Sequence, residues 1–405
     1  MAEKKRILFV GIIMNSGGTE KSFLSFVSAL DFSRFEVDLI LAKNEGLFME
    51  LIPKEVNVRF VEDYGELFLL SGANAAGLLM KTFVKRNPLT AFTIAPSFLK
   101  SKIFPKTKVR EATKLFLRLM KKIPPVTERY DAAIAFWGDR TMFFALDKVT
   151  NAAKKIAWMH FDYSTPPRDD GVYREYFSRC DAIVNVSGAV NDALTAKFPE
   201  IASKCVVIEN IQNKEMIRSL ALTGSSFPDA SAYKGKRILT VGRISYQKGV
   251  DMIPPVLRRL KADGIDARWY IVGGGSDEEK TALITIAVED GVADSMILLG
   301  ETVNPYTYMR DCDVYAQPSR YEGKPIAVEE AKIMRCPIVT ANYLSAKEQL
   351  ADGKFGVIAE ISIDSIYENI RDLLLDGERR RALSETLNRE NFGNADEIEK
   401  FYRLL

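Results

Sequence analysis

Short apolar runs alternate along the whole chain with longer amphipathic segments. Strands are expected in the first half at 6–13, 35–42, 56–61, 131–137, 154–159, 182–187 and 206–209. A second series is expected at 236–241, 267–273, 296–299, 313–316, 337–340 and 356–359. Strands that are apolar almost throughout, with helical stretches between them, indicate parallel sheets covered by helices on both faces. The pattern predicts an α/β fold with two doubly wound, Rossmann-like sheets.

A polar stretch separates the two series of strands. We predict a first domain at 1–210, a linker at 211–235, a second domain at 236–387, and a C-terminal helix at 388–405 that joins the first domain. Two domains suit a chain of 405 residues, because a single core stops growing at roughly 250–300 residues. Ligands of open parallel sheets bind outside the carboxyl ends of the strands. A cleft between the two domains is therefore the expected site.

Composition narrows the class of protein. With 47% apolar and 27% charged residues, the chain is typical of a soluble globular protein. A net charge of +2 gives no general attraction to nucleic acid. No uncharged apolar run reaches the roughly 18 residues that span a membrane. The four cysteines have neither metal-ligand nor disulfide spacing, so we expect small buried thiols in a reducing cytoplasm.

Two cations follow the strand at 236–241. Arg243 comes directly after Gly242, and Lys248 precedes an amphipathic segment. A guanidinium can fork onto phosphate oxygens while an ammonium acts as a point charge, which suits a diphosphate that gains charge as it leaves. The alternative is a pair of solvated surface cations. Pro254-Pro255 fall inside the expected helix, which either begins near Pro254 or is kinked there.

Two carboxylates, Glu322 and Glu330, bracket a predicted helix start. On one continuous helix, eight residues turn through roughly 800°, so the two side chains would not share a face. Pro325 is favoured at the first helical position, which places Glu322 in the preceding loop and Glu330 in the second turn. Free N–H groups at a helix start bind anions. The main chain that can approach such a ligand belongs to Gly323, Lys324 and Ile326.

The first half offers a glycine pair and a histidine. Gly17-Gly18 follow the first strand, where they either bring N–H groups to a ligand or only form a tight turn. This is not the Gly-x-Gly-x-x-Gly fingerprint, and no acid ends the strand at 35–42, which disfavours a dehydrogenase. His160 is the one histidine of the chain and follows a buried strand that ends near the cleft. A site with several histidine metal ligands is therefore excluded.

Further motifs support a family resemblance. They are Ser319-Arg320-Tyr321-Glu322-Gly323, Pro337-Ile338-Val339-Thr340, Val272-Gly273-Gly274-Gly275, Leu298-Leu299-Gly300 and Asn15-Ser16-Gly17-Gly18-Thr19-Glu20. With the cation pair and the Glu-x7-Glu segment, the chain resembles family 4 of the retaining glycosyltransferases (glycosyl transferases group 1). That family has the GT-B fold, in which two Rossmann-like domains face each other across a cleft.

The resemblance implies roles for the matching residues. Arg243 and Lys248 would hold the donor diphosphate. Glu330 would hold the nucleotide ribose, Glu322 the transferred sugar, and His160 would lie close to that sugar. The donor-binding set would be completed by Gly17, Gly18, Gly242, Gly274, Gly323, Lys324, Pro325 and Ile326. Two positions depart from the family: Lys324 stands where an aromatic residue is frequent, and Glu209-Asn210-Ile211-Gln212 replaces an Asn-Pro hinge.

Asp311-Cys312-Asp313 matches the Asp-x-Asp pattern with which other glycosyltransferase folds bind a metal. Asp313 opens a strand at its amino end, on the wrong side of the sheet for a ligand. We favour a structural role, with Arg243 and Lys248 supplying the positive charge. The expectation is a metal-independent enzyme with no cofactor besides its nucleotide-sugar donor.

The segment 81–122 carries twelve cations against Glu111 alone. Its interleaved apolar residues are Phe83, Leu89, Phe92, Ile94, Phe98, Leu99, Ile103, Phe104, Leu115, Phe116 and Leu119. Such a mixture is typical of a surface that binds anionic lipid, which the uncharged stretch 67–80 could join. The alternative is a soluble basic face that caps the first domain. We predict a peripheral protein on the inner face of the cell membrane.

Together these features predict a retaining transferase. It would move a sugar from a nucleotide-diphosphate sugar to a hydroxyl of a glycan or lipid-linked acceptor in cell-surface polysaccharide or glycolipid synthesis. UDP is the expected nucleotide, with GDP and ADP left open. Two alternatives remain, a nucleotide-sugar epimerase or hydrolase of the same fold, and a catalytically silent membrane scaffold.

Overall fold

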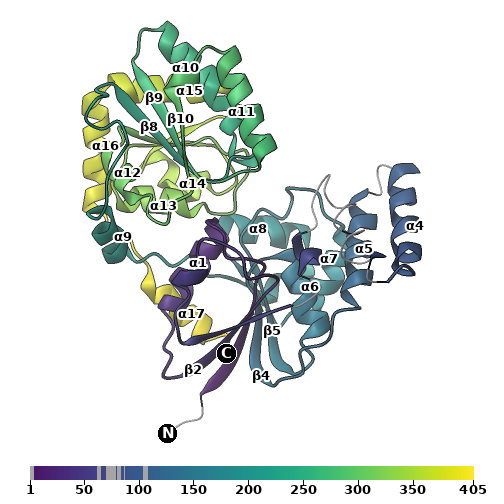
Figure 1. Ribbon diagram of the computed structural model, residues 1–405. Coiled ribbons are helices and arrows are strands. Elements are labelled where there is room, and N and C mark those ends of the chain that lie inside the picture. The colour runs from purple at the N-terminus through teal and green to yellow at the C-terminus, as the bar shows by residue number, and fades with distance from the viewer. Residues whose placement is uncertain (1–3, 62–64, 70–78, 80–83, 86, 104–107) are drawn as a thin grey trace.

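The computed structural model describes residues 4–61, 65–69, 79, 84–85, 87–103 and 108–405 (Figure 1). The first sheet contains β1 (Lys5–Val10), β2 (Phe35–Leu41), β3 (Val56–Phe60), β4 (Tyr130–Ala135), β5 (Ala152–Met159), β6 (Ala182–Asn185) and β7 (Cys205–Val207). The second contains β8 (Lys236–Val241), β9 (Ala267–Val272), β10 (Met296–Gly300), β11 (Val314–Gln317), β12 (Ile338–Ala341) and β13 (Val357–Ala359). All of the predicted strands are present, with ends that differ by a few residues.

Each sheet is parallel throughout. The strand orders are β3-β2-β1-β4-β5-β6-β7 and β10-β9-β8-β11-β12-β13. Successive side chains of a strand face opposite sides of a sheet. Accordingly Leu8 and Val10 belong to one core cluster, and Ile7 and Phe9 belong to another. The sheets are doubly wound, as predicted, and we call each sheet with its helices the first and the second half.

Helices cover both faces of each sheet (Figure 1). In the first half they are α1 (Gly18–Ser28), α2 (Glu66–Leu69), α4 (Thr90–Ile103), α5 (Lys108–Met120), α6 (Asp139–Lys148), α7 (Asp170–Arg179) and α8 (Gly188–Lys197). The remainder are α9 (Lys214–Ala221), α10 (Ile253–Ala262), α11 (Asp277–Glu289), α12 (Tyr306–Asp311), α13 (Ile326–Ile333), α14 (Ala346–Gln349), α15 (Ile363–Leu375), α16 (Gly377–Arg389) and α17 (Ile398–Tyr402).

Two predicted helix starts can be compared with the structure. Helix α10 begins at Ile253, so Pro254-Pro255 stand in its first turn, where a missing N–H group costs no hydrogen bond. The helix therefore starts at the prolines and is not kinked by them. Helix α13 begins at Ile326, one residue later than predicted, because the ψ angle of Pro325 is 120° and extended. Pro325 is the residue that caps the helix.

The chain returns to the first half at its C-terminus. A helix over 388–405 was wrong in extent, because α16 ends at Arg389 and only the short α17 follows. Phe401 of α17 is fully buried and its ring lies 5.0 Å from that of Phe26. Figure 1 shows α17 beside the first sheet. The segment predicted as a linker contains α9, whose Ile217 packs into the core of the second half.

The basic region differs in part from the prediction. Residues 81–83, 86 and 104–107 lie outside the described part of the chain, as do 70–78 and 80. Several apolar residues assigned to a lipid surface are instead buried in the first core: Leu67, Phe68, Leu79, Ile94, Leu115, Phe116 and Leu119. Among the predicted apolar residues whose side chains the structure describes, those that remain exposed are Leu89, Phe92 and Leu99. Within the described residues, no helix has the length and apolar character needed to cross a membrane.

The four cysteines are free thiols. Cys180 and Cys336 are buried as predicted, but Cys205 and Cys312 are partly exposed. Cys205 is the first residue of β7, and Cys312 directly follows α12, two residues before β11.

Candidate functional site

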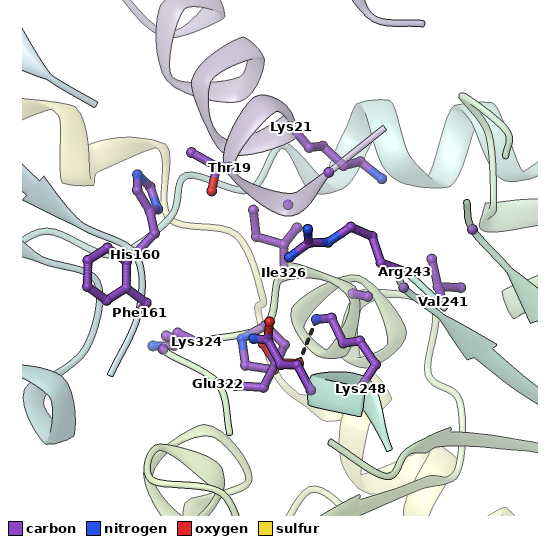
Figure 2. A pocket seen from close by; sticks show the side chains of 18 of the residues that line it. Thr19, Lys21, His160, Phe161, Val241, Arg243, Lys248, Glu322, Lys324 and Ile326 are labelled. Carbon is purple, nitrogen blue, oxygen red and sulfur yellow. Dashed lines mark hydrogen bonds and ion pairs between the residues drawn. The ribbon is translucent and has the colours of Figure 1, made fainter. Parts of the chain in front are cut away.

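A cleft of about 370 Å³ lies between the two halves (Figure 2). Every predicted site residue lines it: Gly17, Gly18 and His160 from the first half, and Gly242, Arg243, Lys248, Gly274, Glu322, Gly323, Lys324, Pro325, Ile326 and Glu330 from the second. Figure 2 shows His160 and Phe161 on the opposite side of the cleft from Arg243 and Lys248. The structure thus brings together residues that are far apart in the sequence, and their roles stay predictions.

Strand ends explain why these residues meet. Gly242, Gly273 and His160 follow the carboxyl ends of β8, β9 and β5, where loops of parallel sheets gather. Gly249 then turns the chain after Lys248 with a φ of 66°, and a Cβ there would lie 2.0 Å from the carbonyl oxygen of Pro318. Only glycine fits this turn, which lets the loop carrying Lys248 pack on the loop before Glu322.

Glu322 and Lys248 form an ion pair. The Lys248 Nζ lies 2.5 Å from Glu322 Oε1, and the same oxygen accepts hydrogen bonds from Ser319 Oγ at 2.7 Å and Gln317 Nε2 at 3.3 Å. The Glu322 carboxylate is buried, so it needs these partners to offset its lost hydration. Because every bond that the structure gives Glu322 is made to Oε1, Oε2 is the atom best placed for a ligand.

Arg243 differs from Lys248. Among the residues that the structure describes, its guanidinium makes no hydrogen bond or ion pair, and it lines the cleft (Figure 2). An unpaired guanidinium in a cleft can accept a bidentate anion without first breaking another contact. The predicted pair of cations is therefore one group whose charge acts on the Glu20 carboxyl without a hydrogen bond or ion pair in the described residues, and one group held in an ion pair by Glu322.

Glu330 is contacted from both halves. Its Oε1 accepts a hydrogen bond from the Tyr306 hydroxyl at 2.9 Å and lies 2.5 Å from Lys21 Nζ of α1. Burial, together with the charge of Glu330, raises the pKa of Tyr306 above its ordinary value, so the hydroxyl stays a donor. The carboxylate is held in one position in the second turn of α13.

His160 is neutral at physiological pH. Burial lowers its pKa from 6.5 to about 3, although the neighbouring Phe136 main chain and Asn210 side chain oppose the shift. The imidazole packs 4.8 Å from the ring of Phe136. Its buried Nε2 has no hydrogen-bond partner among the described residues. A buried, unpartnered ring nitrogen at a cleft is suited to a ligand hydroxyl.

Gly323 allows the two halves to touch at His160. An ideal Cβ on Gly323 would lie 2.2 Å from the carbonyl oxygen of His160 and 2.9 Å from the nitrogen of Phe161. Both neighbours are backbone atoms of the other half and cannot rotate away. The glycine thus permits close contact across the cleft.

The Lys324 side chain is paired with two carboxylates and is not available to a ligand. Its Nζ lies 2.7 Å from Glu209 Oε1 and 3.7 Å from Glu348 Oε1. Burial opposes its charge, but Glu329, Glu209 and Glu348 together raise the pKa of Lys324 above its ordinary value. The ammonium therefore links the chain after β7 to α14, and only the main chain of Lys324 is available to a donor. This ion cluster takes the position where the family often has an aromatic residue.

Three residues near the cleft were not singled out from the sequence. Glu20 accepts a hydrogen bond from Trp137 Nε1 at 3.3 Å, and its burial raises the pKa of the carboxyl from 4.5 to about 7. Lys21 and Tyr306 contact Glu330 as described. The motif Gly17-Gly18-Thr19-Glu20 marked the loop, but no local signal connects Lys21 or Tyr306 to a glutamate so distant along the chain.

Asp313 has a structural role. Its carboxylate accepts hydrogen bonds from the Arg237 main-chain nitrogen at 2.9 Å and from Lys236 Nζ at 3.3 Å. It does not line the cleft, as its place at the amino end of β11 predicted. Across the described parts of the chain, no group of three or more histidine, cysteine, aspartate or glutamate residues is arranged to hold a metal ion.

The fold and cleft define a class of protein, and solved structures agree with it. Two facing, doubly wound parallel sheets are the GT-B arrangement. HepE of Anabaena in complex with UDP and glucose is similar with a TM-score of 0.67 and 15% identity, over 98% of both chains. A glycosyltransferase of Rickettsia africae is similar with a TM-score of 0.64 and 15% identity, over 99% of this chain and 98% of that one. The chain has the GT-B fold.

Sequence comparison finds a family match in the second half of the chain. Residues 226–389 match the family described as glycosyl transferases group 1. The N-acetylgalactosamine-N,N'-diacetylbacillosaminyl-diphospho-undecaprenol 4-alpha-N-acetylgalactosaminyltransferase of Campylobacter jejuni is 29% identical over 209 residues, 51% of this chain and 54% of that protein. The match thus spans about half of that relative. An uncharacterized glycosyltransferase of Haemophilus influenzae is 24% identical over 87% of this chain and 84% of that protein. The segment 226–389, which is less than half of the chain, thus matches the glycosyl transferases group 1 family.

Proposed function

We propose that the protein is a metal-independent, retaining glycosyltransferase that uses a nucleotide-diphosphate sugar, with UDP as the expected nucleotide. The observation that carries this proposal is that the Arg243 guanidinium and the Lys248–Glu322 ion pair line one cleft. The group 1 family match over 226–389 supports it. A solved relative of the same fold that holds UDP and glucose favours a UDP donor.

In the proposed complex, the second half binds the donor. The diphosphate lies against Arg243 and Lys248 at the N-terminus of α13, where free N–H groups favour an anion. Glu330 accepts hydrogen bonds from the ribose, and Glu322 Oε2 accepts one from the transferred sugar. These contacts fix the anomeric carbon against the first half.

The first half presents the acceptor beside Gly17-Gly18 and His160. In a front-face displacement, the acceptor oxygen bonds to the anomeric carbon while the bond from that carbon to the diphosphate breaks. The departing phosphate oxygen takes the acceptor proton, so no separate base is required. Arg243 stabilises the charge that develops on the leaving group. Neutral His160 offers a polar nitrogen to a sugar hydroxyl without adding charge.

Nucleotide binding and turnover test the donor assignment. We expect isothermal titration to detect UDP in preference to GDP and ADP, and a UDP-sugar to be consumed equally with and without EDTA. Arg243→Ala should reduce turnover by at least roughly a hundredfold, since it removes a charge-stabilising group. Arg389→Ala, at an exposed position on α16, is the matched control. Near-normal turnover by Arg243→Ala would contradict the assignment, and quantitative release of free sugar without acceptor would favour a hydrolase.

We further propose a lipid-linked acceptor and peripheral binding to an anionic membrane. On α4, Ile94 and Ser97 face the core, whereas Phe92 and Leu99 are 78% and 61% exposed on the opposite face. Leu89, one residue before α4, is 70% exposed. Four cations close to or within α4 in the sequence are also exposed: Lys85, Lys100, Lys108 and Arg110. An outward apolar face within a basic surface fits an anionic lipid interface.

Vesicle sedimentation tests the membrane contact. The protein should sediment with phosphatidylglycerol vesicles and much less with phosphatidylcholine vesicles. Leu89→Glu with Leu99→Glu should abolish sedimentation, because two charges enter the apolar face. Leu222→Glu with Leu375→Glu changes equally exposed leucines of 78% and 68% in other regions and should have no effect. Equal sedimentation of both double variants would contradict this surface.

A further inference from the structure

The Lys21 ammonium binds the Glu330 carboxylate, which is the group that the ribose of the proposed donor would contact. Lys21 stands in the first turn of α1, and its ammonium reaches Glu330 Oε1 at 2.5 Å across the cleft. The same ammonium lies 4.5 Å from the centre of the Tyr306 ring, and the Tyr306 hydroxyl donates to the same oxygen at 2.9 Å. Glu330 Oε1 therefore already has two donors, one from each half.

The two donors are not equally fixed. Tyr306 is 1% exposed, on α12 of the same half as Glu330, so it cannot leave without disrupting that core. The Lys21 side chain is 20% exposed and extends from the other half on a flexible stem. A ribose that approaches Glu330 with its hydroxyls would therefore displace Lys21 and leave Tyr306 in place.

If ribose displaced Lys21, the loop before α1 would still contact the second half. The Ser16 hydroxyl, in that loop, donates to the carboxylate of Glu301 in the second half. The loop thus has a contact with the second half that does not depend on Lys21. Loss of the Lys21–Glu330 pair can change nucleotide affinity without separating the two halves.

We propose that Lys21 sets donor affinity by competing with the nucleotide ribose for Glu330, an assignment that rests on the proposed function. In the unliganded protein the ammonium compensates the buried carboxylate. When the donor binds, the ribose hydroxyls replace it, and the free energy of the ion pair is lost from the binding free energy. Lys21 of the first half thus covers the position at which the ribose would contact Glu330 in the second half.

Titration with UDP tests this competition. Lys21→Met should bind UDP more tightly than the unaltered protein, by roughly two- to fivefold, the range that an ion pair of this kind can contribute. The gain should shrink for 2′,3′-dideoxy-UDP, which has no ribose hydroxyls to engage Glu330. Lys43→Met is the matched control, because Lys43 pairs with Glu45 at 3.3 Å away from the cleft. It should bind UDP as the unaltered protein does.

Other outcomes separate this inference from the proposed function. Unchanged or weaker UDP binding by Lys21→Met, while the unaltered protein binds UDP, overturns only the role of Lys21. Failure of the unaltered protein to bind UDP, GDP or ADP overturns the proposed function and this inference with it. Because Lys21→Met leaves a buried carboxylate less compensated, Lys21→Gln serves as a second variant that retains a donor. It should show a smaller gain in the same direction.

Discussion

At the scale of single residues, neighbours give the two cleft glutamates different chemistry. Glu322 is fixed through Oε1 by Lys248 and Ser319 of its own half. Glu330 is fixed partly by Lys21 of the other half. The first arrangement can persist when a donor binds, whereas the second has to change if ribose replaces the ammonium. The sequence distinguishes these glutamates only by their positions relative to Pro325.

His160 should make the protein less stable in mild acid. Its folded pKa of about 3 lies below the unfolded value of 6.5, so its stabilising contribution is complete above pH 6.5 and is lost as pH falls towards 3. Between pH 7 and pH 5 the loss is about 2 kcal/mol. His160→Gln should lack this loss in urea unfolding at pH 7, 6 and 5.

A second group shifts stability in the opposite direction. The folded pKa of Glu20 is raised to about 7, so its contribution is present below its unfolded pKa of 4.5 and is lost as pH rises through 7. The unaltered protein and His160→Gln both retain Glu20, so the difference between their free energies of unfolding reports on His160 alone. Because His160 is the sole histidine of the sequence, no other imidazole contributes. Parallel pH profiles for the two proteins would contradict a neutral, buried His160.

Gly323→Ala should disturb the contact between the halves. The new Cβ would lie 2.2 Å from the His160 carbonyl oxygen, and neither backbone can rotate to relieve the overlap. Because small displacements of reacting groups are costly, we expect transferase activity to fall by roughly tenfold or more. Gly377→Ala is the control, since its nearest neighbour would be an Arg380 side-chain atom at an ordinary 3.6 Å. Normal activity of Gly323→Ala would contradict the tight contact.

At the scale of elements, apolar periodicity predicts which segments form but not what covers them. Every expected strand formed, because an apolar run flanked by turns has few alternatives. Periodicity did not separate lipid-facing from core-facing residues in 81–122. Phe92 and Phe116 have the same chemistry, yet Phe92 is exposed on α4 and Phe116 is buried on α5. That difference depends on packing between α4, α5 and the first sheet, which the local sequence does not encode.

Helix α17 should contribute strongly to the stability of the first half. The fully buried ring of Phe401 packs against Phe9, Phe26 and Trp158. Phe401→Ala should lower the free energy of unfolding by about 3–5 kcal/mol, because it leaves a cavity in the aromatic core. Leu375→Ala, at a 68% exposed position, should change it by less than about 0.5 kcal/mol. Urea unfolding measures both, and similar small losses would show that α17 is peripheral to the core.

At the scale of the whole molecule, ionic and polar contacts join the two halves at the cleft and at the hinge. The cleft itself could be predicted, because both sets of strand ends supply its loops. The partners across it could not, since Lys21 with Glu330, and Lys324 with Glu209, pair only after the halves have come together. A lysine stands at position 324, where the family often has an aromatic residue, because its ammonium joins Glu209 of the first half to Glu348 of the second.

Lys324→Met should weaken the contact between the two halves at Glu209 and Glu348. The ammonium lies between Glu209 of the first half and Glu348 of the second, and Glu348 also accepts hydrogen bonds from the main chain of Gly188 and Ala189 at the start of α8. Removing it leaves the Glu209 and Glu348 carboxylates, whose side chains are 37% and 33% exposed, without the cation that they share, so that they repel one another. We expect a larger radius of gyration in solution scattering and faster amide exchange at 208–212 and 188–190. Lys354→Met removes an exposed ammonium that pairs with Glu390 and should change neither measurement. If Lys324→Met has the same radius of gyration and amide exchange as Lys354→Met, the Lys324 ion pairs do not hold the two halves together.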